Sequence, residues 1–367
     1  MSNRLFKRRT VLTAGLATGI LAACTNGRQS SQGSASAPQA AAYQGQTLVA
    51  ACFQGTMETI YKEILAPALK QQTGADLKLV PGLTSEQLAR LRSSPNNPPF
   101  DLVLLDDGNN EIAVQEGLIQ KFPENLSQNS ANVVPEMIGK DGLAPMMFAW
   151  PIVIAYNPQR VKTPPTSWNN LWDANSDARV GLINIGAVIG MVYMVEQARL
   201  LGGSESNIDP AFEIISKNKN KLAAVASNLG SLAALYQQGE ADIGPMFLSD
   251  VLRLKSKGVS IDWAVPESSL AGVRFGLNIV SKPVAPLELA AALVNASVSP
   301  EVQKSISSAP YFFGPAIKDV EITGEIAERL NVRSADELMA EIKILDWTQI
   351  NPNKNAWIER FNKETKG

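Results

Sequence analysis

The sequence predicts an α/β protein built from two successive lobes. Apolar runs of strand length alternate with helical periodicities from residue 47 to about residue 120, and the same alternation begins again after residue 150. Such alternation is typical of a mainly parallel sheet that is covered by helices. The chain has 367 residues, which is enough for two domains that each bury a core. No internal repeat accompanies the pattern.

In the first lobe we expect strands at 47–53, 76–80 and 100–105. The helix after the first strand ends at Gly74, because glycine readily takes the left-handed conformation that closes many helices. Thr84 and Gln87 have the spacing of a capping box, which predicts a helix that starts at Thr84. Gly108 or Asn109 opens the next helix.

A longer series of elements follows residue 150. We expect strands at 151–156, 180–185, 223–227, 242–247, 259–265 and 273–280, and helices at 187–201, 210–219, 231–238 and 249–256. Ser299 before Pro300 is typical of a helix start. Ser334 with Glu337 has the spacing of a second capping box. The tail at 355–365 is amphipathic and is predicted to be a helix.

Residues 1–23 have the character of an export signal. Four basic residues precede an uncharged, mostly apolar run of 14 residues that ends at Ala23. This run is shorter than the roughly 17–25 residues that a membrane-spanning helix needs. A basic segment followed by a short apolar one is typical of a secretion signal. The adjacent Arg8 and Arg9 resemble a twin-arginine signal, and a general secretory signal is the alternative.

The signal ends in Leu21-Ala22-Ala23-Cys24, which resembles the bacterial lipobox. In that motif the cysteine is lipidated and becomes the new N-terminus. A small-residue cleavage site beside an unrelated cysteine is the alternative. Residues 24–46 contain one charge and many Ser, Gln, Ala and Gly residues, a composition typical of a flexible tether. The resemblance therefore implies a lipid anchor at Cys24 that holds a soluble body beside a membrane.

The composition excludes several classes of protein. The chain has no histidine, which removes histidine-based catalytic triads and imidazole zinc sites. Removal of residues 1–23 takes four bases and no acids from the 33 Lys and Arg and 35 Asp and Glu, which leaves a net charge of −6. Because duplex-binding proteins carry a basic excess, we expect no nucleic-acid partner. No nucleophile elbow, phosphate loop or metal-ligand cluster is present, so we expect no enzyme, cofactor or metal.

The two cysteines cannot form a disulfide framework if Cys24 carries lipid. Cys52 then has no partner within the chain. It lies in the apolar run 48–53, which predicts a buried thiol in the core.

Several segments together resemble one family of binding proteins. They are Phe100-Asp101-Leu102-Val103, QEGLIQ at 115–120, TSWNNLW at 166–172, QGEADIG at 238–244 and GLNI at 276–279. Their order and spacing are similar to those of the periplasmic solute-binding proteins of ABC importers (family 1), in the branch that contains spermidine/putrescine and ferric-iron binders. The resemblance runs from about residue 47 to about residue 361.

This resemblance implies a periplasmic binding protein-like fold of type II, in which crossover strands join two α/β lobes that close over a ligand. By analogy, lobe one comprises residues 47–150 plus 274–315, and lobe two comprises residues 151–273 plus 316–367. The chain would leave lobe one near Trp150 and return near Val273. The resemblance also implies a monomer that binds a small solute.

Ligands of open α/β sheets bind beyond the carboxyl ends of the strands, and this rule selects loops in both lobes. The candidate ligand-binding residues on these loops and at the crossover are Gln54, Asp106, Asp107, Asn228, Phe247, Asp250, Arg274 and Tyr311. Alternatives remain for most of them. Asp106 and Asp107 also suit helix N-capping, Arg274 also suits a structural salt bridge, and Phe247 also suits the core.

The predicted ligand is polyamine-like or carries both an amine and an acid group. The resemblance implies that polyamine binders use carboxylates and aromatic faces, but residues 186–190 contain no acid. Arg274 suits a carboxylate or phosphonate, and Asp106 or Asp107 suits an amine. The iron branch uses clustered tyrosines, whereas no two tyrosines are adjacent here.

We therefore expect the substrate-binding lipoprotein of an ABC importer, exported to the periplasm or the outer face of the cell membrane. It would capture a small solute in the cleft between the lobes and deliver it unchanged to ABC permease subunits in the membrane. A solute sensor or scaffold lipoprotein is one alternative, and a secreted enzyme is another.

Overall fold

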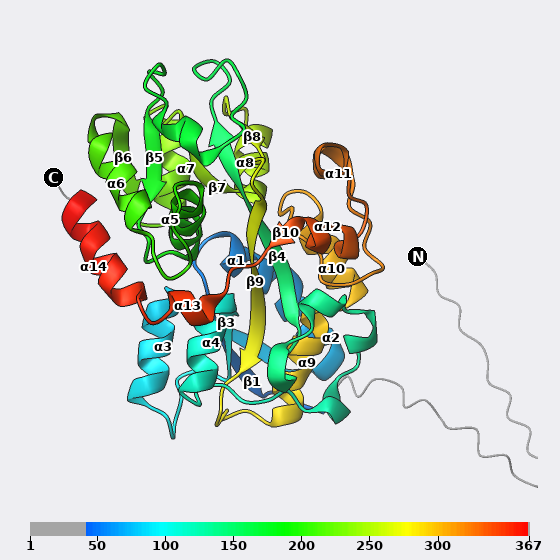
Figure 1. Cartoon of the computed structure of the whole chain (residues 1–367). Coiled ribbons are helices and arrows are strands. Elements are labelled where there is room, and N and C mark those ends of the chain that lie inside the picture. Colours follow the sequence, from blue (N-terminus) through cyan, green and yellow to red (C-terminus); the bar gives the residue numbers. More distant parts are fainter. Residues whose placement is uncertain (1–41, 366–367) are drawn as a thin grey trace, which may run out of the picture. The chain divides into compact units, whose positions relative to one another are not determined.

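The computed structural model describes residues 42–365 (Figure 1). The predicted export signal, the predicted lipidation site Cys24 and most of the predicted tether lie outside the described residues. Within the described residues, no helix combines the length and the apolar character that crossing a membrane would require.

The described residues contain ten strands in one mixed sheet. They are β1 (Thr47–Cys52), β2 (Asp76–Pro81), β3 (Leu102–Asp106), β4 (Met146–Tyr156), β5 (Val180–Ile183), β6 (Leu222–Ala226), β7 (Ile243–Phe247), β8 (Asp262–Ala264), β9 (Leu270–Ile279) and β10 (Ile342–Lys343). Their order is β2-β1-β3-β9-β4-β7-β5-β6, with β10 beside β9 and β8 beside β4. We call β2, β1 and β3 with their helices the first lobe, and β7, β5, β6 and β8 with theirs the second lobe.

Strands β4 and β9 belong to both lobes and join them (Figure 1). Residues 146–151 of β4 pair with β9, and residues 152–156 pair with β7. Residues 275–279 of β9 pair with β3. Pro151 lies where β4 changes partner, a position that suits proline because its nitrogen cannot donate to a ladder.

The sheet is parallel among β1, β2 and β3 and among β5, β6 and β7, whereas β4 runs antiparallel to β7, β8 and β9. β1 pairs parallel with β2 and β3, and β5 pairs parallel with β6 and β7. β9 runs antiparallel to β3 and β4, because the chain returns along it to the first lobe. The expected mainly parallel sheet is therefore correct for β1 to β3 and for β5 to β7, and wrong where β4 and β9 pair with one another and with β3, β7 and β8. The strand predicted at 151–156 is only the second part of β4.

Helices cover both lobes. They are α1 (Thr56–Ile60), α2 (Ala66–Thr73), α3 (Thr84–Ser93), α4 (Asp107–Gln115), α5 (Val188–Leu200), α6 (Asp209–Lys217), α7 (Leu229–Gln237), α8 (Leu248–Ser256), α9 (Leu287–Ser297), α10 (Pro300–Ser307), α11 (Gly324–Leu330), α12 (Ala335–Glu341), α13 (Trp347–Ile350) and α14 (Lys354–Thr365). The π-helical turn η1 (Tyr61–Leu65) joins α1 to α2. The sequence prediction contains no counterpart of α9, α11 or α13.

Three predicted helix ends are confirmed. Gly74 follows α2 with φ of 80° and donates its N–H to Lys70 O. Ser299 Oγ accepts the Val302 N–H, and Ser334 Oγ accepts the Glu337 N–H. Each hydroxyl satisfies a backbone donor that the first helical turn leaves free.

The capping box predicted at Thr84 is wrong. Thr84 is already helical, and Leu83 is the residue that precedes the helix. Glu86 accepts the Leu83 N–H at 3.4 Å. The Gln87 side chain instead donates to Cys52 O at 2.9 Å, which ties α3 to the end of β1. The long-range partner determines the role of Gln87, and spacing along the chain does not reveal it.

Cys52 is fully buried and free, as predicted. Burial raises the pKa of its thiol to about 12, with a smaller contribution in the same direction from Glu58. The thiol is therefore protonated at neutral pH and behaves as a small apolar side chain.

Asp101 connects three segments of the first lobe. Its Oδ2 accepts the Val49 N–H of β1 at 2.8 Å, and its Oδ1 accepts the N–H groups of Val284 and Ala285, each at 2.8 Å. The side chain is 2% exposed. The acid in the sequence FDLV at 100–103 therefore has a structural role, because it satisfies three backbone donors.

We predict that Asp101→Ala lowers the free energy of unfolding by about 3–5 kcal/mol, since it leaves several backbone N–H groups without their charged acceptor. Denaturant unfolding followed by circular dichroism measures this. Asp76→Ala is the matched control, because Asp76 is exposed and only pairs with Lys70, and it should cost less than about 1 kcal/mol. Equal losses for the two variants would contradict the assigned role.

Candidate functional site

Aromatic side chains fill the junction of the two lobes. Trp150 of β4 stacks on Phe247, the last residue of β7, with the ring centroids 3.8 Å apart. Phe313 packs against Trp150 at 5.0 Å and against Phe148 at 4.5 Å. Phe275 of β9 stacks on Phe148 at 5.1 Å. The crossing point is therefore held by apolar packing between strands of both lobes.

Phe247, a predicted ligand contact, is 1% exposed and lies in this cluster. The Trp150 indole also donates to Ser249 Oγ at 2.6 Å, just beyond the end of β7. The Trp150 ring covers one face of Phe247, and Ser249 satisfies the Trp150 indole N–H within the protein. In this conformation Phe247 packs in the core.

Asp107 and Arg274, predicted to bind the amine and the acid group of a solute respectively, bind one another. Arg274 donates from Nε and Nη2 to Asp107 Oδ1 at 3.0 and 2.7 Å, and its backbone N–H donates to Oδ2 at 2.7 Å. Arg274 Nη1 donates to Glu136 O. Each residue is only 8% exposed. The pair therefore joins the start of α4 to β9 and satisfies both charges within the protein.

Asp106 and Asp250 also have partners within their own helices. Asp106 caps α4, where Oδ1 accepts the Asn109 N–H at 3.1 Å and Oδ2 accepts the Asn109 side-chain amide at 2.5 Å. Asp250 accepts from Arg253 one turn along α8. Both aspartates are less than 5% exposed. Burial raises the pKa of Asp250, and Arg253 offsets only part of that effect.

The remaining predicted residues lie nearer the surface. Gln54 is exposed in the turn between β1 and α1. Asn228 is exposed and caps α7, where its Oδ1 accepts the Ser231 N–H at 2.9 Å. The Tyr311 hydroxyl donates to Glu63 at 3.2 Å. The structure therefore pairs Asp107 with Arg274 but does not gather the eight predicted residues around one cavity.

A cavity of about 440 Å³ lies beside the junction. One wall is α8 of the second lobe, through Leu248, Leu252 and Lys255. The opposite wall is the segment 307–315, which includes Phe312 and which pairs with β4 through Gly314 and Ala149. Residues 322–326 at the start of α11 close a third side. Pro151, where β4 changes partner, also contacts the cavity.

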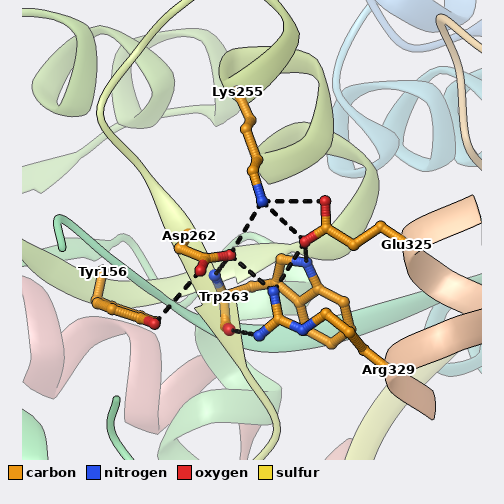
Figure 2. Close-up of polar contacts among 6 residues, drawn as sticks. All are labelled: Tyr156, Lys255, Asp262, Trp263, Glu325 and Arg329. Carbon is orange, nitrogen blue, oxygen red and sulfur yellow. Dashed lines mark hydrogen bonds and ion pairs between the residues drawn. The ribbon is translucent and has the colours of Figure 1, made fainter. Parts of the chain in front are cut away.

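The cavity lining is mostly apolar and carries two charged residues. They are Lys255 of α8 and Glu325 of α11, which lie in a common network of charges (Figure 2). Lys255 Nζ is 2.9 Å from Glu325 Oε1 and 3.4 Å from Asp262 Oδ1. Arg329 Nη1 is 2.7 Å from Asp262 Oδ1 and 2.8 Å from Glu325 Oε1.

Trp263 and Tyr156 complete this network. The Arg329 guanidinium lies 3.7 Å from the centre of the Trp263 ring, and Trp263 Nε1 donates to Glu325 Oε1 at 2.8 Å. The Tyr156 hydroxyl donates to Asp262 Oδ2 at 3.4 Å (Figure 2). The network attaches α11 to β8 and α8, and it therefore fixes one wall of the cavity.

Sequence reasoning missed Lys255, Glu325 and α11 because few α11 residues are apolar and buried. The spacing of Glu325 and Arg329, four residues apart, is a helix-stabilising ion-pair pattern and could have indicated α11. No sequence pattern indicates that Lys255 lies beside Glu325, because the two residues are about 70 positions apart in the chain.

The network holds its carboxylates in the charged form. Burial alone would raise the pKa of Asp262, but hydrogen bonds from Arg329 and from the Trp263 backbone lower it overall. Burial alone would also raise the pKa of Glu325, but hydrogen bonds from Lys255 and Arg329 lower it overall. A carboxylate with a lowered folded-state pKa stabilises the fold above its unfolded pKa, and this stabilisation is lost as the pH falls through the folded value.

We predict that Arg329→Met lowers the free energy of unfolding by about 1 kcal/mol at pH 7 and by less below about pH 4, where the carboxylates become protonated. Denaturant unfolding across this pH range measures the difference. Lys217→Met is the control, because Lys217 pairs only with the exposed Glu213. A loss that does not change with pH would show that the ion pairs contribute nothing.

A family model described as "Bacterial extracellular solute-binding protein" matches residues 49–309. A Sinorhizobium fredii protein named as an ABC transporter periplasmic-binding protein, y4fP, is 22% identical over 305 residues, which cover 80% of each chain. A Salmonella typhi periplasmic protein, named for 2-aminoethylphosphonate binding, is 21% identical over 82% of this chain and 86% of its own.

Solved structures share the fold. An ABC transporter protein from Clostridium perfringens superposes with a TM-score of 0.69 at 21% identity, covering 87% of this chain and all of the other. A periplasmic thiamin binding protein gives a TM-score of 0.70 at 19% identity, covering 88% and 96%. The fold is that of periplasmic binding proteins, as expected from the sequence. Because the family model matches well over half of the sequence, the chain belongs to the bacterial extracellular solute-binding proteins.

Proposed function

We propose that this protein is the lipid-anchored solute-binding component of an ABC importer. It captures a small solute in the cavity beside the lobe junction and passes it unchanged to permease subunits. In this role the protein catalyses no reaction, because the family consists of solute-binding proteins. Export and a lipid anchor at Cys24 rest on the sequence of residues 1–24. A monomer is sufficient for this function.

The position of the cavity between parts of both lobes is the main support for this function. Its walls come from α8 in the second lobe and from the segment 307–315, which pairs with the first-lobe part of β4. Pro151, at the crossing point, contacts it as well. A rotation of the lobes about β4 and β9 would therefore change the volume of this cavity. A solute that contacts both walls favours the conformation in which they are closest.

We further assign the lobes the boundaries expected from the sequence, residues 47–150 plus 274–315 and residues 151–273 plus 316–367. The change of partner at Pro151 supports the first boundary. The contact of α11 with β8 and α8 supports placing that part of the C-terminal segment in lobe two. Helix α13 is different, because it packs on α4 of the first lobe.

The charges of the cavity favour a solute with one amine and one acid group. Lys255 suits a carboxylate or phosphonate, and Glu325 suits an ammonium group. Both side chains are partly exposed, so a solute can take the place of their mutual contact. A polyamine requires a carboxylate for each ammonium, and Glu325 is the only acid among the lining residues. The relative named for 2-aminoethylphosphonate binding supports the same class, since that molecule has an amine and a phosphonate.

We predict that the protein binds 2-aminoethylphosphonate, used as the probe, more tightly than spermidine. Lys255→Met and Glu325→Gln should each weaken this binding at least tenfold, which corresponds to about 1.4 kcal/mol, because each removes one charged partner. Isothermal titration calorimetry measures the affinities. Lys257→Met, also on the second lobe but outside this cavity, should leave the affinity unchanged.

Two results would contradict this proposal in different ways. Tight binding of spermidine with no binding of the probe would reject the ligand class. Unchanged probe affinity in Lys255→Met and Glu325→Gln would reject this cavity as the site. The melting temperature of each variant, measured by thermal shift in the absence of ligand, shows whether the variant is folded.

We predict that Cys24→Ser moves the protein from the membrane fraction of the producing cells to the soluble fraction, because the substitution removes the thiol that carries the lipid. Immunoblots of both fractions measure this, and mass spectrometry of the intact protein detects the lipid. Cys52→Ala should remain in the membrane fraction, since Cys52 is buried. Membrane retention of Cys24→Ser would contradict the anchor.

A further inference from the structure

The C-terminal segment 342–365 contacts both lobes. It begins with β10, which pairs with Leu270 and Ala271 of β9 at the junction. It continues through α13, which packs on α4 of the first lobe, and ends in α14, which packs on the second lobe (Figure 1). We call residues 342–365 the strap. It is a further connection between the lobes, in addition to β4, β9 and the segment that leads from residues 307–315 to α11.

The first-lobe contact of the strap is at Gly108 in the first turn of α4. The Trp347 ring lies so close that a Cβ atom on Gly108 would be 2.4 Å from it. The Asn351 side-chain amide donates to Gly108 O at 3.0 Å. Trp347 is 4% exposed. Only glycine at position 108 allows the ring to approach this closely.

The second-lobe contact of the strap is made mainly by α14, and the Asp346 N–H before α13 also donates to Glu205 Oε1 at 3.0 Å. The Asn184 side chain, just after β5, donates to Asn362 Oδ1 at 2.6 Å. Arg360 lies 4.0 Å from the centre of the Phe212 ring of α6 and also pairs with Asp209. Phe361 is 1% exposed.

Both contacts lie at the carboxyl ends of parallel strands, β3 in the first lobe and β5 in the second. A rotation of one lobe against the other about β4 and β9 moves Gly108 relative to Asn184. The strap is anchored near both residues, so one contact must adjust when the lobes rotate.

The two contacts differ in how well their polar atoms are satisfied. At the first-lobe contact, Trp347 Nε1 and Asn351 Oδ1 are buried and have no hydrogen-bond partner among the described residues. No α14 side-chain atom within the described residues is in that condition. Buried polar atoms without partners weaken a contact. The contact of α13 with α4 is therefore the weaker of the two, and it is the one that breaks when the lobes rotate.

We infer that the strap is a latch between the lobes, and that release of α13 from α4 permits them to separate while α14 stays on the second lobe. The latch acts without solute and does not require the cavity to be the binding site. It sets the fraction of molecules with separated lobes, and so the free energy that any solute must supply to close them.

The test uses Gly108→Ala and Asn351→Ala in the full chain without added solute. Gly108→Ala forces the Trp347 ring away, and Asn351→Ala removes the hydrogen bond to Gly108 O. Hydrogen–deuterium exchange should become at least about threefold faster in β10 and in residues 270 and 271 of β9, with which β10 pairs. Small-angle X-ray scattering should show a larger radius of gyration.

Asn353→Ala is the matched control, because Asn353 lies in the same turn but donates only to Gln349 within the strap. It should leave the exchange rates and the radius of gyration unchanged. Faster exchange confined to α13, with an unchanged radius of gyration, would overturn the latch and leave α13 as a passive cover. Because no solute is present, neither result depends on the proposed ligand.

Discussion

The antiparallel pairing of β4 with β9 is the constraint on which the rest of the structure depends. Residues 146–151 of β4 pair with β9, and its next residue, Ile152, pairs with Phe247 of β7. Two strands therefore belong to both lobes, and the parallel strands of each lobe end at the gap between them. The helices α4, α5, α7 and α8 each follow one of these strands, so their N-terminal ends face the junction. It also places Pro151 and the segment 307–315 beside α8, where they form the cavity.

The pairing of charges decides which residues are free to bind a solute. Asp107 and Arg274 are buried and satisfy one another, so removing either partner would leave an unpaired charge in the interior. Lys255 and Glu325 are partly exposed, and each contact between them is screened by water. A solute can replace such a contact at little cost. The proposed binding site therefore uses the weaker ion pairs, whereas the buried pair joins α4 to β9.

The sequence predicted the fold well, whereas it did not reveal how the candidate site residues pair with one another, and there is a physical reason. Periodicity, glycine and capping residues act over a few positions, and they located most strands and the ends at Gly74, Ser299 and Ser334. The resemblance supplied the two-lobe arrangement. The partner of a side chain depends on residues far along the chain. Arg274 and Asp107 are 167 residues apart, and no local pattern indicates that one neutralises the other.

The lobes are coupled through contacts of different kinds, and this difference determines how they can move. The stacked rings of Trp150 and Phe247 can slide over one another with little loss of buried area, because dispersion contacts are not directional. The hydrogen bond from Trp150 to Ser249 is directional and resists that motion. Ion pairs of the α11 network lie on the second lobe and move with it. A hinge built in this way keeps a dry core through its motion, while a few directional contacts, those of the strap included, select the conformations at which it rests.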